Sequence, residues 1–252
     1  MNVIHNNSHP QPDTTIDVIR SSLATGAASR FLTSLPTFLI RRPSQLDSWK
    51  VVGHSTAADF ALAFYSSIGL DGERTRKDLL GYPGLLRDLS NPPPWVELEP
   101  EDIDGDLDPE RARDLSSLIL QTQSSSNEEL VASFRAELEE RNSLLRRFIG
   151  LPSVSAIVVD NRIESFRRLL SLARVLNLSG FETVYDSVFD FDEFDVKSGV
   201  PDLLLWLPDK IPSLWFFSEV KAPGDYLGSS QKSWLHEHWG ILRGHYCLTV
   251  LE

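Results

Sequence analysis

The chain has 252 residues, of which 41% are hydrophobic and 24% charged, enough for one large domain or two small ones around a buried core. Its formal net charge of −12 argues against a protein that coats nucleic acid non-specifically, because neutralising phosphates requires clustered lysine and arginine. The negative charge does not exclude an enzyme that binds phosphate through a divalent metal, since the carboxylates that hold such a metal contribute negative charge themselves. The single cysteine, Cys247, excludes an internal disulfide, and no apolar run reaches the roughly 18–20 residues of a membrane span. We expect an intracellular protein.

The N-terminal half of the chain predicts mainly helices. Residues 1–15 are polar and predict disorder. Apolar spacing predicts helical pieces between Ile16 and Ile40 and a helix over Ser55–Tyr65. We therefore divide the chain into a disordered start, a helical part over residues 16–126 and a C-terminal core over residues 127–252.

The C-terminal core alternates between helix and strand patterns. Amphipathic periodicity predicts helices over Asn127–Ile149, over Ile163–Leu176, where Gly180 ends the helix, and over Asp225–Leu242. Apolar runs with strand-forming residues predict strands over Gly199–Leu207, Ser213–Lys221 and Tyr246–Leu251. Helices followed by strand, strand, helix and strand indicate an α/β domain.

The first two of these strands can pair as a hairpin. If the turn is centred between Lys210 and Ile211, antiparallel pairing sets Asp202 opposite Glu219. Directly opposed Cβ atoms lie about 5 Å apart, where two carboxylates repel each other, so the pair requires a compensating cation. Mg²⁺ or Mn²⁺, bound through carboxylates, carbonyls and water, would supply it.

Lys221 turns this pair of carboxylates into a candidate catalytic site. Strand periodicity puts Glu219 and Lys221 on one face, about 6.5–7 Å apart, and leaves the Val220 carbonyl as a further metal ligand. A divalent ion held by Asp202 and Glu219 would activate water, and the lysine would orient that water or stabilise charge on the phosphorane. The alternative interpretation is that all three are ordinary charged residues near a turn and a strand end.

The sequence around these residues resembles a known family. The matching runs are GVPDLLLW at Gly199–Trp206 and SEVKAPGD at Ser218–Asp225, followed by Leu227, Gln231, Trp234 and Leu235. They are similar to the VRR-NUC (virus-type replication-repair nuclease) domain of the Fanconi-anaemia-associated nuclease type, within the PD-(D/E)xK nuclease superfamily. A weaker resemblance extends over residues 45–252, which would correspond to the catalytic domain alone.

The resemblance implies a restriction-endonuclease-like core, with a mixed central β-sheet flanked by helices, that uses one or two Mg²⁺ or Mn²⁺ ions. It implies cleavage of DNA as a 5′-flap endonuclease and 5′→3′ exonuclease in repair, with flap or branched DNA and repair proteins as partners, no membrane, and the nucleus as location in a eukaryote. Asp202 and Glu219 then match metal ligands, Val220 the carbonyl ligand and Lys221 the catalytic lysine. Gln231 matches a helix glutamine near the site, although it could equally be a solvent-facing helix residue.

Two departures from the family pattern matter. The family's additional metal-binding Glu, on an early helix in a Gly-Glu-Gly-Ser-Thr context, has no match in Gly53–Thr56. Asp59, about one turn onward, is the first candidate to replace it, and Glu164 the second. Where the family has an arginine after the matching Asp, this chain has Tyr226, which removes a phosphate contact but leaves a candidate nucleic-acid contact.

Further candidates for nucleic-acid binding are arginines of the helix predicted around residue 163, namely Arg162, Arg167 and Arg168. Their alternative interpretation is the solvated outer face of an amphipathic helix. The leading hypothesis is therefore a metal-dependent DNA nuclease. The alternatives are a catalytically weakened or inactive nuclease-fold binding module, and a mobile-element or toxin nuclease of the same family.

Overall fold

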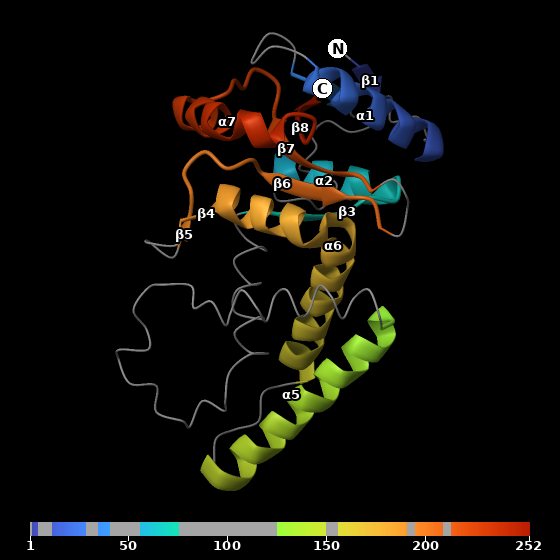
Figure 1. The fold of residues 1–252 in the computed structure, drawn as a ribbon, viewed down its shortest axis with the longest axis vertical. Coiled ribbons are helices and arrows are strands. Elements are labelled where there is room, and N and C mark those ends of the chain that lie inside the picture. Colours follow the sequence, from blue (N-terminus) through green and yellow to red (C-terminus); the bar gives the residue numbers. More distant parts are fainter. Residues whose placement is uncertain are drawn as a thin grey trace. The chain divides into compact units, whose positions relative to one another are not determined.

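A computed structural model gives the fold (Figure 1), and the structure describes residues 2–4, 12–28, 35–40, 56–75, 125–149, 156–190, 195–208 and 213–252. The chain divides into two compact units. The first unit comprises Met1–Leu79, Thr183–Phe189 and Val196–Glu252, and the second comprises Leu80–Glu182 and Asp190–Asp195.

The first unit is built on a six-stranded mixed sheet. Its strands, in spatial order, are β1 (Asn2–Ile4), β2 (Thr37–Ile40), β8 (Tyr246–Leu251), β7 (Trp215–Lys221), β6 (Leu203–Trp206) and β3 (Asp71–Arg74). The pairs β1–β2, β2–β8 and β7–β8 are parallel, whereas β6 pairs antiparallel with both β7 and β3. The predicted α/β class with a mixed central sheet flanked by helices is confirmed.

Helices cover both faces of this sheet. On one face lies α2 (Ala57–Ser67), whose Tyr65 ring meets Phe216 edge-on at 6.0 Å. On the other lies α7 (Ser229–Leu242), whose Trp234 contacts Phe217 and Tyr246. Because side chains alternate along a strand, Phe216 and Phe217 point to opposite faces, and both are fully buried.

The helix α1 (Pro12–Ala27) packs on the same face of the sheet as α2. Ile16, Ile19 and Leu23 recur at helical spacing and join one hydrophobic core with residues of β2, β6, β7 and β8. Cys247 is fully buried in this core, as expected for a packing residue.

Three hydroxyl groups lie inside this otherwise apolar face. Thr249 Oγ1 is 2.7 Å from the Tyr65 hydroxyl and 2.6 Å from Ser218 Oγ, and all three residues are fully buried. Each polar group therefore has a partner, which removes most of the cost of burying it. The chain of contacts ties α2 and β8 to the residue that precedes Glu219 on β7.

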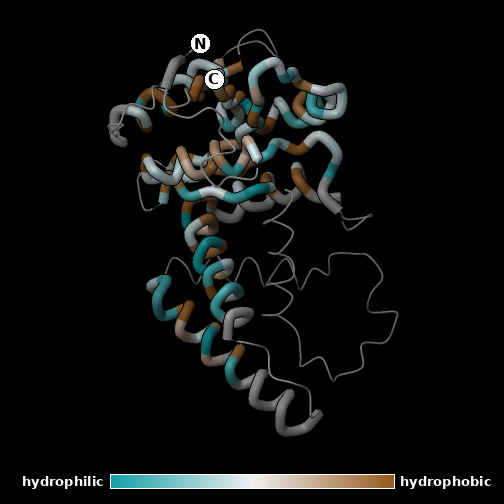
Figure 2. The backbone as a smooth tube through the Cα atoms, turned by 180° about the vertical axis from the view of Figure 1, so that it is seen from behind, coloured by the Kyte–Doolittle hydropathy of each residue, from teal (hydrophilic) through white to brown (hydrophobic). Residues whose placement is uncertain are grey.

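The second unit contains α5 (Asn127–Ile149) and most of α6 (Ala156–Val188). The predicted bounds of α5 are confirmed, and hydrophobic residues recur among hydrophilic ones along it (Figure 2). Phe134 of α5 and Phe166 of α6 pack with ring centroids 4.3 Å apart. The strands β4 (Phe189–Asp190) and β5 (Asp195–Val196) form a separate two-stranded sheet. No helix in the described part of the chain is long and apolar enough to cross a bilayer.

Several N-terminal expectations are wrong. Residues 2–4 form β1 and a helix begins at Pro12, so the expectation of disorder over residues 1–15 fails for these residues. Residues 37–40 form β2 rather than a helix, and β3 was not expected, so the part over residues 16–126 is not purely helical. Short apolar runs such as that of β2 fit either structure, and pairing with distant strands decides between them. The division into three parts otherwise stays a prediction.

Two helix ends also differ from the prediction. The helix expected to stop at Gly180 continues to Val188, because glycine inside a helix costs only about 1 kcal/mol relative to alanine and does not by itself end it. The helix expected from Asp225 begins at Ser229, because a Pro-Gly turn precedes it.

Two glycines with the same backbone conformation allow a matched test of the contact between the turn before β6 and the start of α7. Gly199 has φ +85° and Gly224 φ +87°. A Cβ on Gly199 would lie 2.3 Å from the Ser230 carbonyl oxygen and 2.8 Å from the Gln231 nitrogen, whereas a Cβ on Gly224 would meet nothing within 4 Å.

Gly199→Ala is therefore expected to destabilise the fold more than Gly224→Ala. Alanine in the left-handed region costs roughly 1–2 kcal/mol at either site, and only at Gly199 must the start of α7 also move. Urea unfolding of both variants measures the difference. Equal losses of stability would contradict the close contact between Gly199 and α7.

Candidate active site

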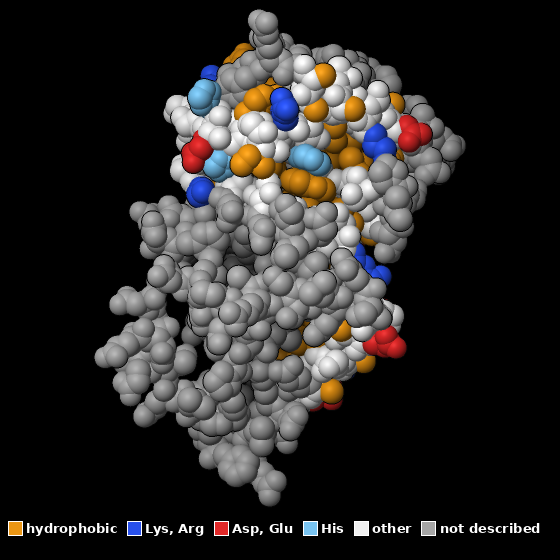
Figure 3. All heavy atoms as spheres, viewed as in Figure 1, with side chains coloured by type: hydrophobic (Ala, Val, Ile, Leu, Met, Phe, Trp, Pro, Cys, Tyr) orange, Lys and Arg blue, Asp and Glu red, His pale blue; other side chains and the backbone are white. Residues whose placement is uncertain are grey.

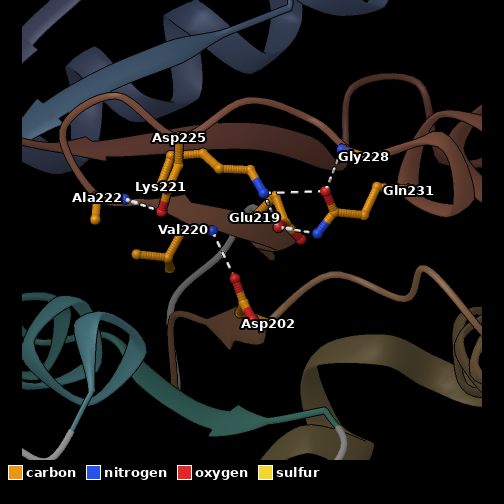
Figure 4. A network of polar contacts seen from close by, with 8 residues as sticks. All are labelled: Asp202, Glu219, Val220, Lys221, Ala222, Asp225, Gly228 and Gln231. Carbon is orange, nitrogen blue, oxygen red and sulfur yellow. Dashed lines mark hydrogen bonds and ion pairs between the residues drawn. The ribbon is translucent and has the colours of Figure 1, made fainter.

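The hairpin of β6 and β7 has the predicted register. Leu203 pairs with Ser218 and Trp206 with Trp215, so continuing the ladder by one residue sets Asp202 opposite Glu219. The Val220 backbone N–H donates to Asp202 Oδ2 at 2.9 Å, which holds this carboxylate against β7 (Figure 4).

The segment before β6 is also fixed from the side of β3. The Thr75 N–H donates to the Asp202 carbonyl at 3.1 Å, and the Thr75 hydroxyl donates to the Pro201 carbonyl. Thr75 is fully buried. Asp202 is therefore held through its backbone carbonyl by the residue after β3 and through its carboxylate by β7.

Glu219, Lys221 and Gln231 form a closed network (Figure 4). Lys221 Nζ lies 2.8 Å from Glu219 Oε1 and donates to Gln231 Oε1 at 3.0 Å. The Gln231 amide nitrogen donates to the same Glu219 oxygen, and the Gly228 N–H donates to Gln231 Oε1 at 2.8 Å. Gln231 therefore faces the site rather than solvent alone, and its contacts hold both a carboxylate and a lysine.

Burial makes this site unfavourable for negative charge. Burial and then the charge of Asp202 raise the pKa of Glu219 to about 7, against the opposing effect of Lys221. Burial also raises the pKa of Asp202, although the Val220 N–H and the charges of Lys221 and Arg74 oppose this. Burial disfavours the ionised form of both carboxylates, and a bound divalent cation would stabilise that form. The donor set thus fits Mg²⁺ or Mn²⁺, whose ligands in proteins are oxygen atoms.

Asp59 has other partners. It accepts from Arg74 Nη1 at 3.0 Å and from the Thr56 hydroxyl at 2.8 Å, while its N–H donates to Thr56 Oγ1 in the N-cap of α2. Among the described residues, no three Asp, Glu, His or Cys side chains gather closely enough to hold a metal. The structure therefore brings Asp202 and Glu219 together without Asp59 as a third ligand.

The strand β3 contributes residues to the site that the sequence pattern does not predict. Arg74 links Asp59 of α2 electrostatically to Asp202, and Thr75 fixes the backbone of the site. Glu73, opposite Leu204, is a further carboxylate with 2% exposure. No local signal marks these residues, because the four residues of β3 are polar or glycine and read as a loop.

The candidate arginines belong to the second unit. Arg167 lies 3.9 Å from Glu128 and 3.5 Å from Glu164, and Arg168 lies 3.8 Å from Glu164. These exposed ion pairs offset the positive charge, and they also engage Glu164, the second candidate metal ligand. The side chain of Arg162 lies outside the described residues.

Tyr226, by contrast, lies in the loop between β7 and α7 and is 86% exposed. Asp225 closes the turn before it, since its N–H donates to the Ala222 carbonyl and its carboxylate accepts from the Ala222 N–H. Asp225 therefore has a structural role, and Trp234 and Leu235 are buried.

The comparison with family models agrees with the resemblance seen in the sequence. Residues 187–239 match the family model of the VRR-NUC domain, and this segment includes both site carboxylates, Lys221 and Gln231. No curated protein matches the chain.

Two solved structures are similar over most of this chain. Crystal structures of paFAN1 bound to gapped DNA with a 2-nt or a 1-nt 5′ flap are 15% and 17% identical and cover 98% and 86% of this chain, with TM-scores of 0.35 and 0.34. This chain covers only 43% and 37% of those two chains.

The raised pKa of Glu219 predicts a pH-dependent stability in the presence of a chelator. Between about pH 4.5 and 7 the folded protein holds a proton on Glu219 that the unfolded chain has lost, so the free energy of unfolding falls as pH rises. The expected loss is on the order of a few kcal/mol by pH 8. Urea unfolding across this range measures it. Glu219→Gln should flatten the dependence, and an unchanged dependence in this variant would assign it to another group.

Proposed function

We propose that this chain, which carries a VRR-NUC nuclease domain over residues 187–239, hydrolyses DNA phosphodiester bonds with the help of divalent metal. The observation that carries the proposal is the opposed pair of half-buried Asp202 and buried Glu219, with Lys221 Nζ 2.8 Å from Glu219 Oε1. Purely structural packing has little use for two like charges opposed in a hairpin, whereas a metal-assisted hydrolase requires them.

In this proposal Asp202 and Glu219 hold Mg²⁺ or Mn²⁺, one ion or two, and the Val220 carbonyl adds a further oxygen. When bound, the cation lowers the pKa of water and withdraws charge from the phosphate. Lys221 is a fixed positive charge on the same strand face, and it stabilises the negative charge that develops on the phosphate oxygens.

Gln231 is a positioning residue in this scheme. Its amide nitrogen reaches Glu219 and its amide oxygen accepts from Lys221, so the two charged groups keep one relative orientation. The Gly228 N–H in turn holds the amide oxygen. A site whose supporting contacts come from backbone groups and buried side chains loses little energy on reorganisation during the reaction.

For the substrate, we propose DNA with a 5′ flap or another branch, cleaved as endonuclease and as 5′→3′ exonuclease in repair. Repair proteins as partners and, in a eukaryote, the nucleus as location belong to the same proposal. The family resemblance of the GVPD and EVK runs supports this substrate. The residues of the site themselves explain phosphodiester hydrolysis but do not select one form of DNA.

A second function has one specific observation in its favour. A catalytically weakened or inactive nuclease-fold binding module would explain why the described residues bring two, not three, metal-binding side chains together. Calorimetry with Mn²⁺ separates the two functions, since tight binding that Glu219→Gln abolishes would contradict the inactive module. A mobile-element or toxin role of the same nuclease has no structural observation in its favour.

The first test is cleavage of a 5′-flap DNA in the presence of Mn²⁺. Asp202→Ala and Lys221→Ala are expected to remove activity, because each deletes a charge that the reaction requires, and EDTA should have the same effect. Lys232→Ala is the matched control, since Lys232 is exposed on the first turn of α7. Cleavage that Asp202→Ala leaves unchanged would refute the assignment of the site.

The second test concerns Gln231. Gln231→Ala is expected to lower kcat by about 10–100-fold, as removal of a group that orients a metal ligand does. The neighbouring exposed residue Ser233 provides the control variant Ser233→Ala. Single-turnover cleavage at saturating metal measures the effect. Equal rates for the two variants would show that the network does not position Lys221.

A further inference from the structure

The loop that joins β7 to α7, between Lys221 and Gln231, carries an exposed aromatic side chain. Tyr226 is five residues from Lys221 and five from Gln231 in the chain. It is 86% exposed, whereas the other two exposed large hydrophobic residues of the described chain, Ile241 and Val18, are 67% and 37% exposed. A tyrosine left in water gives up the burial that an aromatic ring otherwise contributes to stability.

The backbone around this tyrosine is held in one conformation. Pro223 and Gly224 occupy a turn closed by the Asp225 N–H on the Ala222 carbonyl at 3.0 Å, and the Asp225 carboxylate accepts from the Ala222 N–H at 3.3 Å. On the C-terminal side of the loop, the Gly228 N–H donates a hydrogen bond to Gln231 Oε1 (Figure 4). Tyr226 therefore lies between a hydrogen-bonded turn that follows Lys221 and the Gly228–Gln231 contact of the network.

Electrostatics gives this protein little general affinity for phosphate. The chain carries a net charge of −12, and on the described surface that Figure 3 shows, Lys and Arg side chains are scattered rather than gathered in a patch. Base stacking on an aromatic ring needs no positive charge and contributes about 1–3 kcal/mol per base. An exposed aromatic ring would therefore supply affinity that this charge distribution does not.

We propose that Tyr226 stacks on an unpaired nucleobase of the substrate strand next to the bond that is cut. This stacking contact rests on the proposed nuclease function and would account for part of the enzyme's preference among DNA substrates. Bases inside a duplex already have both faces covered by their neighbours, so a single exposed ring favours a flap, a gap or a frayed end over intact duplex.

Binding is measured in the Asp202→Asn background, so that cleavage does not interfere. The probe is a fluorescein-labelled oligo-dT single strand, followed by anisotropy. Tyr226→Ala is expected to weaken binding by about 5–150-fold, the range that the loss of one stacked base predicts. Tyr226→Phe, which keeps the ring, should restore binding. Ile241→Ala is the control, because it removes an exposed hydrophobic side chain from the far end of α7.

Salt dependence distinguishes stacking from phosphate contact. The slope of log Kd against log salt should be the same with and without Tyr226, since the ring neutralises no phosphate. The inference is overturned if Tyr226→Ala binds as its parent does, if Phe fails to replace Tyr, if the slope changes, or if the parent does not bind the single strand. Binding that depends on Tyr226 in a protein that cuts no DNA would instead refute the proposed nuclease function and leave the stacking contact standing.

Discussion

The burial of Glu219 opposite Asp202 is the constraint on which the rest of the first unit depends. A carboxylate with 1% exposure, facing a second carboxylate across a hairpin, holds its pKa near 7 and costs stability whenever it is ionised. Lys221 and Gln231 offset part of this cost through one oxygen of Glu219. Folding thus leaves a concentration of negative potential in the sheet that metal binding would relieve.

The surrounding elements keep this unfavourable arrangement in place. Thr75 holds the backbone around Asp202 from β3, and the buried hydroxyls of Tyr65, Thr249 and Ser218 connect α2 and β8 to β7 behind the site. On the other face, Gly199 packs directly against the first turn of α7, the turn that carries Gln231. Strands from both ends of the chain therefore support the hairpin of β6 and β7. Burial of the sheet on both faces offsets the loss of stability that the opposed carboxylates cause.

The same geometry bears on function. Two carboxylates, a lysine and a glutamine provide part of the contacts that a metal-assisted hydrolase requires, while Asp59 pairs with Arg74 and with Thr56, the N-cap of α2. Metal affinity is therefore the property that separates an active nuclease from an inactive binding module. With a net charge of −12, general electrostatic attraction to nucleic acid is weak, which is why the proposed stacking role falls to the exposed ring of Tyr226.

The sequence alone determined the strands around the site and the register that opposes Asp202 to Glu219, because alternation and a short connection leave few ways to pair two apolar runs. The family resemblance added Gln231, which the structure joins to Glu219 and Lys221. Only the tertiary structure revealed β1, β2 and β3, since these short strands are defined by partners far away in the chain. Tertiary structure also decided which side chain pairs with Asp59. The helix that carries Asp59 was predictable, but its ion pair with Arg74 depends on where β3 packs against α2. Local pattern specifies what a segment can form, and long-range packing decides which side chains meet.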